Sequence, residues 1–557
     1  MKKQYFDLME QVLSAYTDEH IVRYFEDVKN NGLREHGFAR LTSNIGILIA
    51  QGKRLDLRPV FLEMMEFCCK TIPNVKAAND FTVREIVCCI RELEENNGAN
   101  PEDIQRWKDY LATIDPTTCY NEFARKPTDN VHNWALFTGV SEFFRQQMGL
   151  CDSTEFIDIQ LESQFQWLDE NGMYRDNAES EIHQPIVYDL VPRGLFSALL
   201  HAGYRGKHYQ RIDDCLRKAN MLTLKMQSVT GELAFGGRSN QFLHNEAWVA
   251  AIFEYEAVRY HREGDAIQAG VFKAAAAKAL ENMKLWLAKR PINHVKNRFS
   301  KDSMFGCEGY AYFDKYMITA ASFLYMAYMF CDDGIPAVEI EEKPEIWCTS
   351  RYFHKIFAKA GGYCLEFDTD GDPHYDASGL GRVHKKGAPS TVCLSVPCPE
   401  EPAYGTDLEK PVALSICPGT KVDGAWHFAV GADCTYSVED LIQNDTSAVV
   451  KLKCLFSDNK TVTATYTVDE TGVELEAVGD GPVAWMLPAF SFDGEKHTEI
   501  AVTENDLIVS YEGWKCSYAT DGTVVDTGRI ACNRNGHYCI FQAEGWDRLL
   551  VKIMIHS

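Results

Sequence analysis

The spacing of apolar residues changes once along this 557-residue chain, and that change limits the possible folds more than any other feature. Up to about residue 335, apolar residues recur at helical spacing, as in YFDLMEQVLSAY, HNWALFTGVSEFF and EAWVAAIFEYEAV. Beyond CDDGIPAVEIEEKPE, short runs rich in β-branched and aromatic residues are separated by Gly, Asp and Asn, as in STVCLSVP, KTVTATYTV, HYCIFQAEGW and LLVKIMIHS. The sequence therefore predicts a helical half followed by an antiparallel β half.

A chain of this length is too long for one ordinary hydrophobic core, so we expect two large domains. The segment 335–347 is rich in Pro and Glu and is the best candidate for a connection. We predict a helical domain over 1–334, a linker over 335–347 and a β-sandwich domain over 348–557.

The helical half repeats one plan, in which a helix, a long polar loop and a more apolar helix follow each other. The repeated helix starts are about 50 to 70 residues apart, in the range that indicates a repeated supersecondary unit. About twelve helices would make six hairpins, and such hairpins can close into a ring. We predict an (α/α)6 toroid followed by an antiparallel β-sandwich, with the polar loops on one rim, where functional residues are common.

Charge and cysteine usage exclude some classes of protein. The formal net charge of −24 disfavours nucleic-acid binding, because a phosphate backbone would be repelled. The N-terminal residues lack the apolar core of a signal peptide, and no window approaches the roughly 20 apolar residues of a membrane span. Nineteen cysteines without an export signal predict free thiols and a cytoplasmic location, and the absence of CxxC and HExxH motifs gives no support for a metal site. No cofactor is expected.

Aromatic rings and forked hydrogen-bonding side chains gather in the predicted rim loops, as in GGRSNQFLHNEAW (236–248). Rings stack on the C–H faces of sugars, and the forked groups match hydroxyl pairs or a carboxylate. No P-loop or glycine fingerprint suggests a nucleotide. The candidate catalytic residues are His244, Glu246, Tyr310, His183 and Tyr188. The candidate substrate-binding residues are Arg238, Asn245, Asn130, His132, Trp134, Trp248, Tyr312 and Arg193.

Each type of candidate also has an ordinary structural explanation. Trp134 and Trp248 begin apolar helices and could be core anchors, whereas Asn130 and Asn245 could cap helices. Glu246 could be a first-turn acid that complements the helix dipole. His374, Tyr375, Arg382, His384 and Lys386, at the start of the β half, could reach the same pocket or simply form a turn.

The segments GGRSNQFLHNEAW, GCEGYAYFDKYM, DNVHNW and YDASGLGRVHKKG resemble, loosely, the toroid-plus-sandwich carbohydrate-active enzymes. Most broadly the chain is similar to the heparinase II/III-like polysaccharide lyases and to related toroid families that include glucuronidases. The resemblance implies β-elimination beside a uronate, in which a neutraliser binds the carboxylate, a base removes the C5 proton and an acid protonates the departing oxygen. By residue type, Asn245, Asn130 and Arg238 could neutralise, His244 or His183 could be the base, and Tyr310 or Tyr188 could be base or acid.

Two other functions stay open from the sequence. A glycoside hydrolase needs two nearby carboxyl groups, for which Asp129, Asp189, Glu246, Glu308 and Asp314 are available. A non-catalytic sugar-binding protein would also explain the aromatic and amide side chains. In all three cases the expected partner is an oligosaccharide, most simply a uronate-bearing one, with no nucleic acid and no membrane; the sequence does not predict the oligomeric state.

Overall fold

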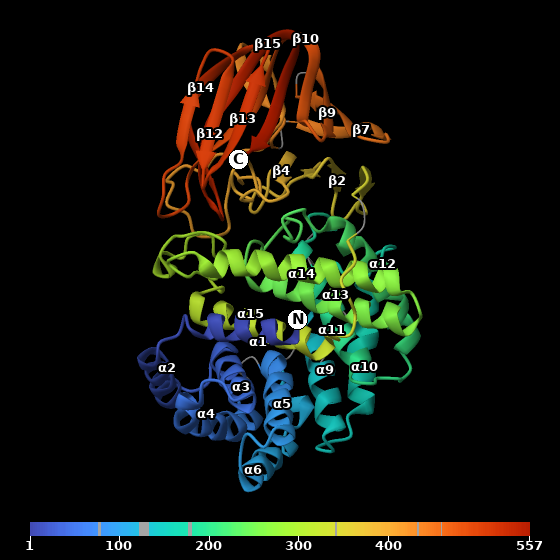
Figure 1. The fold of residues 1–557 in the computed structure, drawn as a ribbon, viewed down its shortest axis with the longest axis vertical. Coiled ribbons are helices and arrows are strands. Elements are labelled where there is room, and N and C mark those ends of the chain that lie inside the picture. Colours follow the sequence, from blue (N-terminus) through green and yellow to red (C-terminus); the bar gives the residue numbers. More distant parts are fainter. Residues whose placement is uncertain (76–78, 122–132, 177–180, 340–341, 432–433, 458) are drawn as a thin grey trace.

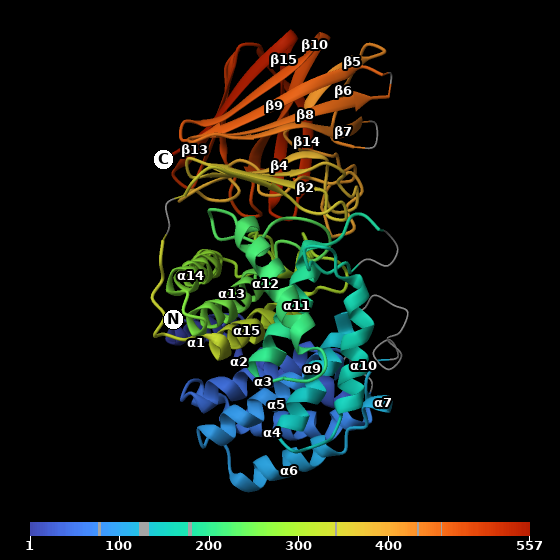
Figure 2. The ribbon, with the colours of Figure 1, turned by 90° about the vertical axis from the view of Figure 1, so that its right-hand side faces the viewer.

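The computed structural model describes residues 1–75, 79–121, 133–176, 181–339, 342–431, 434–457 and 459–557. Helices occupy the chain up to Phe330, and strands begin at Glu345. Figures 1 and 2 show the helices as one body and the sheets stacked on one side of it. The order of helices and then antiparallel strands predicted from the sequence is confirmed.

Fourteen α-helices lie in the described residues. They are α1 (Lys2–Leu13), α2 (Asp18–Asn31), α3 (Gly37–Ala50), α4 (Arg58–Thr71), α5 (Asn79–Glu95), α6 (Pro101–Ala112), α7 (Pro116–Cys119), α9 (Asn133–Gln147), α10 (Thr154–Gln164), α11 (Ile186–His201), α12 (Tyr209–Met226), α13 (His244–Arg262), α14 (Ala266–Ala288) and α15 (Phe313–Phe330). Short 3-10 helices occur at Leu55–Leu57, Ile72–Asn74, Phe165–Trp167 and Lys301–Ser303. None of the described helices is both long enough and apolar enough to cross a membrane.

Six of these helices form a closed inner ring. Contacts run in the order α3, α5, α9, α11, α13 and α15, and α15 returns to α3. The outer helices α1, α4, α10, α12 and α14 pack on the inner helices α15, α3, α9, α11 and α13, while α6 packs on α4 and α5. The inner helices are apolar on most sides because both faces are covered, as shown by α3, in which every residue from Gly37 to Ile49 is buried. This is the predicted (α/α)6 toroid.

Local sequence signals set the ends of the outer helices. In α2 the Thr17 side chain accepts a hydrogen bond from the His20 backbone N–H, and Asp18 and Glu19 lie in the first turn, where acidic side chains complement the helix dipole. The helix ends at Gly32, whose φ of 82° is accessible to glycine at little cost. Only Ile21, Phe25 and Val28 of this helix are buried, so it presents one face to the toroid.

The β half contains a four-stranded and an eleven-stranded antiparallel sheet. The smaller sheet has the order β1 (Glu345–Cys348), β2 (Lys355–Ala360), β3 (Tyr363–Asp368) and β4 (Gly379–Lys385). The larger sheet runs β11 (Glu499–Val502), β12 (Asp506–Tyr511), β13 (Trp514–Thr520), β15 (Gly536–His556), β10 (Gly472–Phe492), β9 (Thr461–Asp469), β8 (Ala448–Phe456) and β7 (Cys434–Gln443). Beside this path, β14 (Thr523–Asn533) pairs with β15, and β5 (Pro418–Val422) pairs with β10 and with β6 (Ala425–Phe428). In Figures 1 and 2 the smaller sheet lies between the helices and the larger sheet.

Alternation along the strands explains how the sheets bury one face. In β8 and β9 buried and less buried residues alternate along nearly the whole strand, as expected for a sheet with one covered face. Most apolar residues of the helices form one large cluster, which Phe353 and Phe357 of the β half join, and most apolar residues of the sheets form a second. All nineteen cysteines are free thiols, and most of them are buried.

Three details of the β half differ from the sequence-based expectation. STVCLSVP is not a strand but irregular chain with one β-bridge, at Leu394. Its backbone accepts hydrogen bonds from side chains instead of from a neighbouring strand: Arg382 Nε donates to Ser395 O at 2.8 Å. HYCIFQAEGW and LLVKIMIHS, expected as two strands, form the single strand β15, which continues past a register shift in its pairing with β10. The strand β1 begins inside the segment 335–347, because Trp347 stacks on Phe357 of β2 with ring centroids 4.9 Å apart.

Candidate active site

The six inner helices begin around a cavity of about 710 Å³. Each of them contributes residues from its first turns, so the positive ends of six helix dipoles face this space. The lining residues are Arg34, Glu35, His36, Arg40, Phe81, Asn133, Trp134, Phe137, Asp176, Val187, Tyr188, Val191, Arg238, Ser239, His244, Trp248, Tyr310, Lys315, Tyr316, Thr319 and Phe323. A larger groove of about 980 Å³ lies on the outside of α10, away from the inner ring, and has no aromatic lining.

One side of the cavity is cationic. Arg40 is 2% exposed, donates from Nε to Glu85 at 2.9 Å, and has an Nη2 atom without a hydrogen-bond partner among the described residues. Its Nη1 lies 3.0 Å from His36 Nδ1. Burial, followed by Arg40, Lys315 and His244, lowers the pKa of His36 well below its usual value. Burial also lowers the pKa of the Lys315 ammonium. Positive groups are thus crowded here although the chain as a whole is strongly acidic.

His244 lies at the floor of the cavity, at the start of α13. Burial, followed by Arg40, His294 and Lys296, lowers the pKa of His244 to about 3, so the imidazole is neutral at neutral pH. Its ring centroid is 5.6 Å from that of Tyr316. Trp248, one turn further along α13, is fully buried and packs on Phe323 with ring centroids 3.8 Å apart.

Three hydroxyl groups meet on the other side of the cavity. Ser239 Oγ lies 2.9 Å from Tyr310 Oη and 3.2 Å from Tyr188 Oη, and the two tyrosine hydroxyls are 3.5 Å apart. Burial, followed by Tyr188 and Glu308, raises the pKa of Tyr310 far above its usual value. Tyr310 is therefore protonated at neutral pH, and it can release its proton only to a strongly basic oxygen. The Tyr316 ring lies between the two sides, with its centroid 5.9 Å from that of Tyr310 and 5.6 Å from Lys315 Nζ.

Arg238 and Asp176 close the cavity next to the hydroxyl groups. The Arg238 guanidinium donates to the Asp176 carboxylate, and also to the Asp176 backbone oxygen at 2.9 Å. It stacks over the Tyr188 ring at 4.2 Å. Burial raises the pKa of Asp176 to about 6, although Arg238 and Asn133 act in the opposite direction. Arg238 is thus already paired with a carboxylate.

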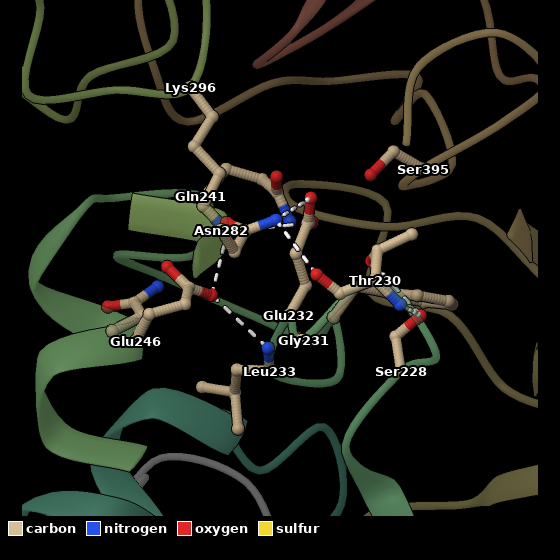
Figure 3. A network of polar contacts seen from close by, with 12 residues as sticks. Ser228, Thr230, Gly231, Glu232, Leu233, Gln241, Glu246, Asn282, Lys296 and Ser395 are labelled. Atoms are coloured by element: carbon tan, nitrogen blue, oxygen red, sulfur yellow. Dashed lines mark hydrogen bonds and ion pairs between the residues drawn. The ribbon is translucent and has the colours of Figure 1, made fainter. Parts of the chain in front are cut away.

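Glu246 does not line this cavity. It is fully buried behind it, where Oε1 accepts hydrogen bonds from Lys296 Nζ at 2.7 Å and from the Leu233 backbone N–H at 3.2 Å. Lys296 also lies 3.5 Å from Glu232, whose carboxylate accepts from Asn282 at 3.2 Å. Figure 3 shows Glu246, Leu233, Lys296 and the other residues of this network. Burial raises the pKa of Glu246, while Lys296 acts to lower it.

Several other predicted site residues also lie outside the lining. Asn245 donates to Ser239 O at 3.2 Å, and Arg193 is fully buried, paired with Asp189 and bonded to Thr223 Oγ1 at 2.6 Å. Tyr312 is 37% exposed. His183 donates from its backbone to His354 Nε2 at 3.2 Å, where the two halves of the chain meet. Asn130 and His132 lie outside the described residues.

The structure thus brings Tyr188, Arg238, His244, Trp248, Tyr310 and Trp134 together at one cavity. From the β half, Arg382 and His384 are buried where the two halves meet, and neither lines the cavity. Sequence reasoning missed the cationic side, formed by Arg40 and Lys315 with the His36 imidazole beside Arg40. A signal was present, because REHGFAR (34–40) is another polar segment at the start of an apolar helix, the plan used to find the other rim loops.

A ring of inner helices joined to antiparallel sheets, with a cavity at the inner helix starts that aromatic and cationic side chains line, defines a toroid-plus-sheet architecture with a candidate site. No known protein-family profile matches the sequence, and no curated protein matches it. Among solved structures, a heparinase III aligns with a TM-score of 0.51 at 10% identity, covering 93% of this chain and 78% of its own. The chain therefore has the heparinase III fold, which confirms the resemblance seen in the sequence at the level of the fold.

More distant similarities were also found. A heparan sulfate lyase mutant from Pedobacter heparinus aligns with a TM-score of 0.46 at 9% identity, covering 94% of this chain and 76% of its own. A glycosyl hydrolase of family 88 from Bacteroides vulgatus aligns with a TM-score of 0.38 at 12% identity, covering 59% of this chain and 98% of its own.

Proposed function

We propose that this protein is a lyase that cleaves uronate-containing oligosaccharides by β-elimination in the cavity at the inner helix starts. The observation that carries the proposal is the presence, within one cavity, of a cationic side with an unsatisfied Arg40 guanidinium nitrogen and of a separate cluster of hydroxyl groups. The heparinase III whose fold this chain shares acts, by its name, on heparin-like polymers, and the proposal agrees with that likeness without depending on it.

The cationic side fits the carboxylate of a uronate. Arg40 Nη2 has no hydrogen-bond partner among the described residues, and a buried, unpaired guanidinium nitrogen is costly unless a ligand satisfies it. Lys315 and the helix N-termini add positive potential, which favours an anion. Charge stabilisation at the carboxylate is what this reaction needs, because proton loss from C5 places negative charge on that group.

The remaining groups supply the proton transfers. His244 is neutral and can accept the C5 proton, and the negative charge of a bound uronate beside the same cations would raise the pKa of this imidazole towards the working pH. As the C5–H bond breaks, its electron pair forms the C4=C5 double bond and the C4–O4 bond breaks. Tyr310, protonated and bonded to Ser239, donates its proton to the departing O4. Trp134, half-buried at the edge of the cavity, offers a ring for a sugar face.

Hydrolysis is the second candidate, and one observation favours it. Asp176 lines the cavity with a pKa raised to about 6, as suits a general acid, and Glu35 is a second lining carboxyl group. Both groups already have partners, however: Asp176 is paired with Arg238, and Glu35 accepts from Tyr24 Oη and from the Gly37 backbone N–H. Elimination uses the unsatisfied Arg40 Nη2 and the neutral His244 and needs neither of these carboxyl groups, and this is why we favour it.

The test is product analysis with a matched pair of substrates. A uronate-containing oligosaccharide and the same oligosaccharide with its carboxyl groups reduced to alcohols are incubated with the protein. We expect the first to yield an unsaturated uronate with its conjugated ultraviolet absorbance, and the second to remain intact. Release of saturated sugars without that absorbance would establish the hydrolase instead, and binding without any cleavage would establish a sugar-binding protein.

A further inference from the structure

The loop that carries Arg238 and Ser239 has an unusual backbone. Gly236 and Gly237 have φ values of 145° and 73°, and the non-glycine residues Ser239 and Gln241 have φ values of 58° and 63°. The left-handed region is disfavoured for residues with a Cβ atom and persists only where surrounding contacts impose it. Ser239 is one of these residues, and its hydroxyl lies between Tyr188 and Tyr310. The contacts that hold the loop therefore matter for the site.

Several of those contacts lead to the β half. The Gly237 backbone N–H donates to Asp376 Oδ2 at 2.8 Å, and Asn535 Nδ2 donates to Gln241 Oε1 at 3.2 Å. Asp376 precedes β4, and Asn535 lies in the turn between β14 and β15. The Ser239 backbone N–H donates to Glu308 Oε1 at 2.6 Å.

Glu308 is in turn fixed by Arg534, the neighbour of Asn535 in the same turn. Arg534 Nη2 donates to Glu308 Oε1 at 2.6 Å, Nη1 donates to Oε2 at 3.1 Å, and Nη1 also donates to Gly306 O at 2.6 Å. Both side chains are 3% exposed or less, and the guanidinium stacks on the Tyr404 ring at 4.2 Å. Such a two-point fork fixes the orientation of a carboxylate as well as its distance, which a lysine cannot do.

We propose that Arg534 is a positioning residue, which acts from the β half through Glu308 on Ser239 and so sets the hydroxyl groups of Tyr188 and Tyr310 in the cavity. Glu308 Oε1 joins the two parts, because it accepts from both Arg534 and the Ser239 backbone. The effect on catalysis rests on the proposed function, in which Tyr310 donates the proton, whereas the effect on the loop does not. The β half would then be part of the machinery that shapes the site.

The test compares Arg534→Met and Arg534→Lys with Arg298→Met. Arg298 is a buried arginine that also joins the two halves, by pairing with Asp493 and Glu495, but it makes no hydrogen bond to residues 236–241 among the described contacts. Amide hydrogen exchange of the peptide spanning 236–241 reads the loop directly, with or without activity. We expect faster exchange there in both Arg534 variants and wild-type exchange in Arg298→Met.

Steady-state kinetics on the uronate oligosaccharide read the catalytic consequence. Displacing a reacting group by about 1 Å can lower turnover by about 100-fold. We therefore expect kcat to fall by up to that factor in Arg534→Met, with KM little changed. Arg534→Lys keeps the charge and should recover only part of kcat, and it serves as the second variant if Arg534→Met does not fold. Arg298→Met should keep the wild-type kcat.

The outcomes separate the two proposals. Wild-type exchange at 236–241 in both Arg534 variants would overturn the positioning role, whatever the activity. Faster exchange with an unchanged kcat would overturn its link to catalysis. Absence of any elimination by the wild-type protein would refute the proposed function alone, and the exchange measurement would still decide whether Arg534 holds the loop.

Discussion

Tyr310 and Tyr312 are close in sequence but have different surroundings. A substitution of Tyr312 can therefore serve as the control for the same substitution of Tyr310. The Tyr310 hydroxyl is 2.9 Å from Ser239 Oγ and lines the cavity, whereas Tyr312, which is exposed to a similar extent, lies beside Lys315 and does not line the cavity. Tyr310 lies in the turn before α15, whereas Tyr312 is the N-cap residue of α15, so the backbone gives the two side chains different surroundings. Any role of the phenol proton should therefore belong to Tyr310.

We predict that Tyr310→Phe lowers kcat on the uronate oligosaccharide by about 10²- to 10⁴-fold, the range expected for loss of a general acid. KM should change little, because the carboxylate is held on the other side of the cavity. Tyr312→Phe removes the same atom outside the cavity and should retain the wild-type kcat. Initial rates of unsaturated product measure both variants. Equal rates for Tyr310→Phe and the wild-type protein would exclude this residue as the acid.

At the scale of elements, the contact between the smaller sheet and the helical half depends on a buried histidine of β4. His384 Nδ1 lies 2.7 Å from Ser228 Oγ, and its Nε2 lies 3.2 Å from Ser395 Oγ. Burial, followed by Arg382, lowers the pKa of His384 to about 3. In the unfolded chain a histidine titrates near 6.5, so the two states differ in bound protons between these values.

We predict that His384 makes the fold sensitive to acid. Above about pH 6.5 the group is neutral in both states, and it adds no pH dependence. As the pH falls below that value the unfolded chain takes up a proton that the folded chain does not, which lowers the free energy of unfolding by up to about 1.4 kcal/mol per pH unit. His384→Gln should lose this component, although it costs about 1 kcal/mol at neutral pH through weaker hydrogen bonds.

Urea denaturation gives the free energy of unfolding at about pH 7 and at about pH 5. The effect of His384 is the difference between the wild-type protein and the variant in how far this free energy changes between the two pH values. The wild-type free energy of unfolding should fall more than that of His384→Gln over this interval. His374→Gln, which changes a histidine that is 53% exposed in its side chain, should follow the wild-type protein. An identical pH dependence for all three proteins would show that His384 is not a source of acid sensitivity.

The sequence predicted the helices and strands better than it predicted which side chains meet at the cavity. Helical and alternating periods gave the toroid and the sheets, because burial imposes those periods directly. The prediction of a strand at STVCLSVP was wrong, because the apolar residues of this segment are buried without belonging to a sheet. The spacing of apolar residues does not distinguish these two cases. Glu246 and His244, two positions apart on α13, were both plausible, yet one faces Lys296 and the other the cavity. Which side of a helix faces a cavity depends on its neighbours, so only the fold separates them.

At the scale of the whole molecule, the two halves are joined by apolar packing and by buried polar contacts. Phe353 and Phe357 of the β half belong to the apolar cluster of the helices, while most apolar residues of the sheets form a cluster of their own. Between them, Arg382 Nη1 donates to Leu233 O at 2.8 Å and pairs with Glu366 at 3.0 Å, while Glu366 accepts from the Phe235 backbone N–H at 3.2 Å. Separating the halves would break the hydrogen bonds to Leu233 and Phe235, which lie in the helical half, and would uncover the apolar surface around Phe353 and Phe357, so it would be costly.

We therefore predict that the halves unfold together. Hydrogen exchange at increasing denaturant should give peptides from α5 and from β10 the same midpoint. Arg382→Met should lower both midpoints together. We expect the free energy of unfolding to fall by about 3 to 5 kcal/mol, because Glu366 stays buried without its arginine partner. Arg548→Met removes an exposed pair with Glu476 and should cost at most about 1 kcal/mol. If the β10 peptides in Arg382→Met opened well before those of α5, the halves would be independent folding units, and the buried charges would be only local contacts.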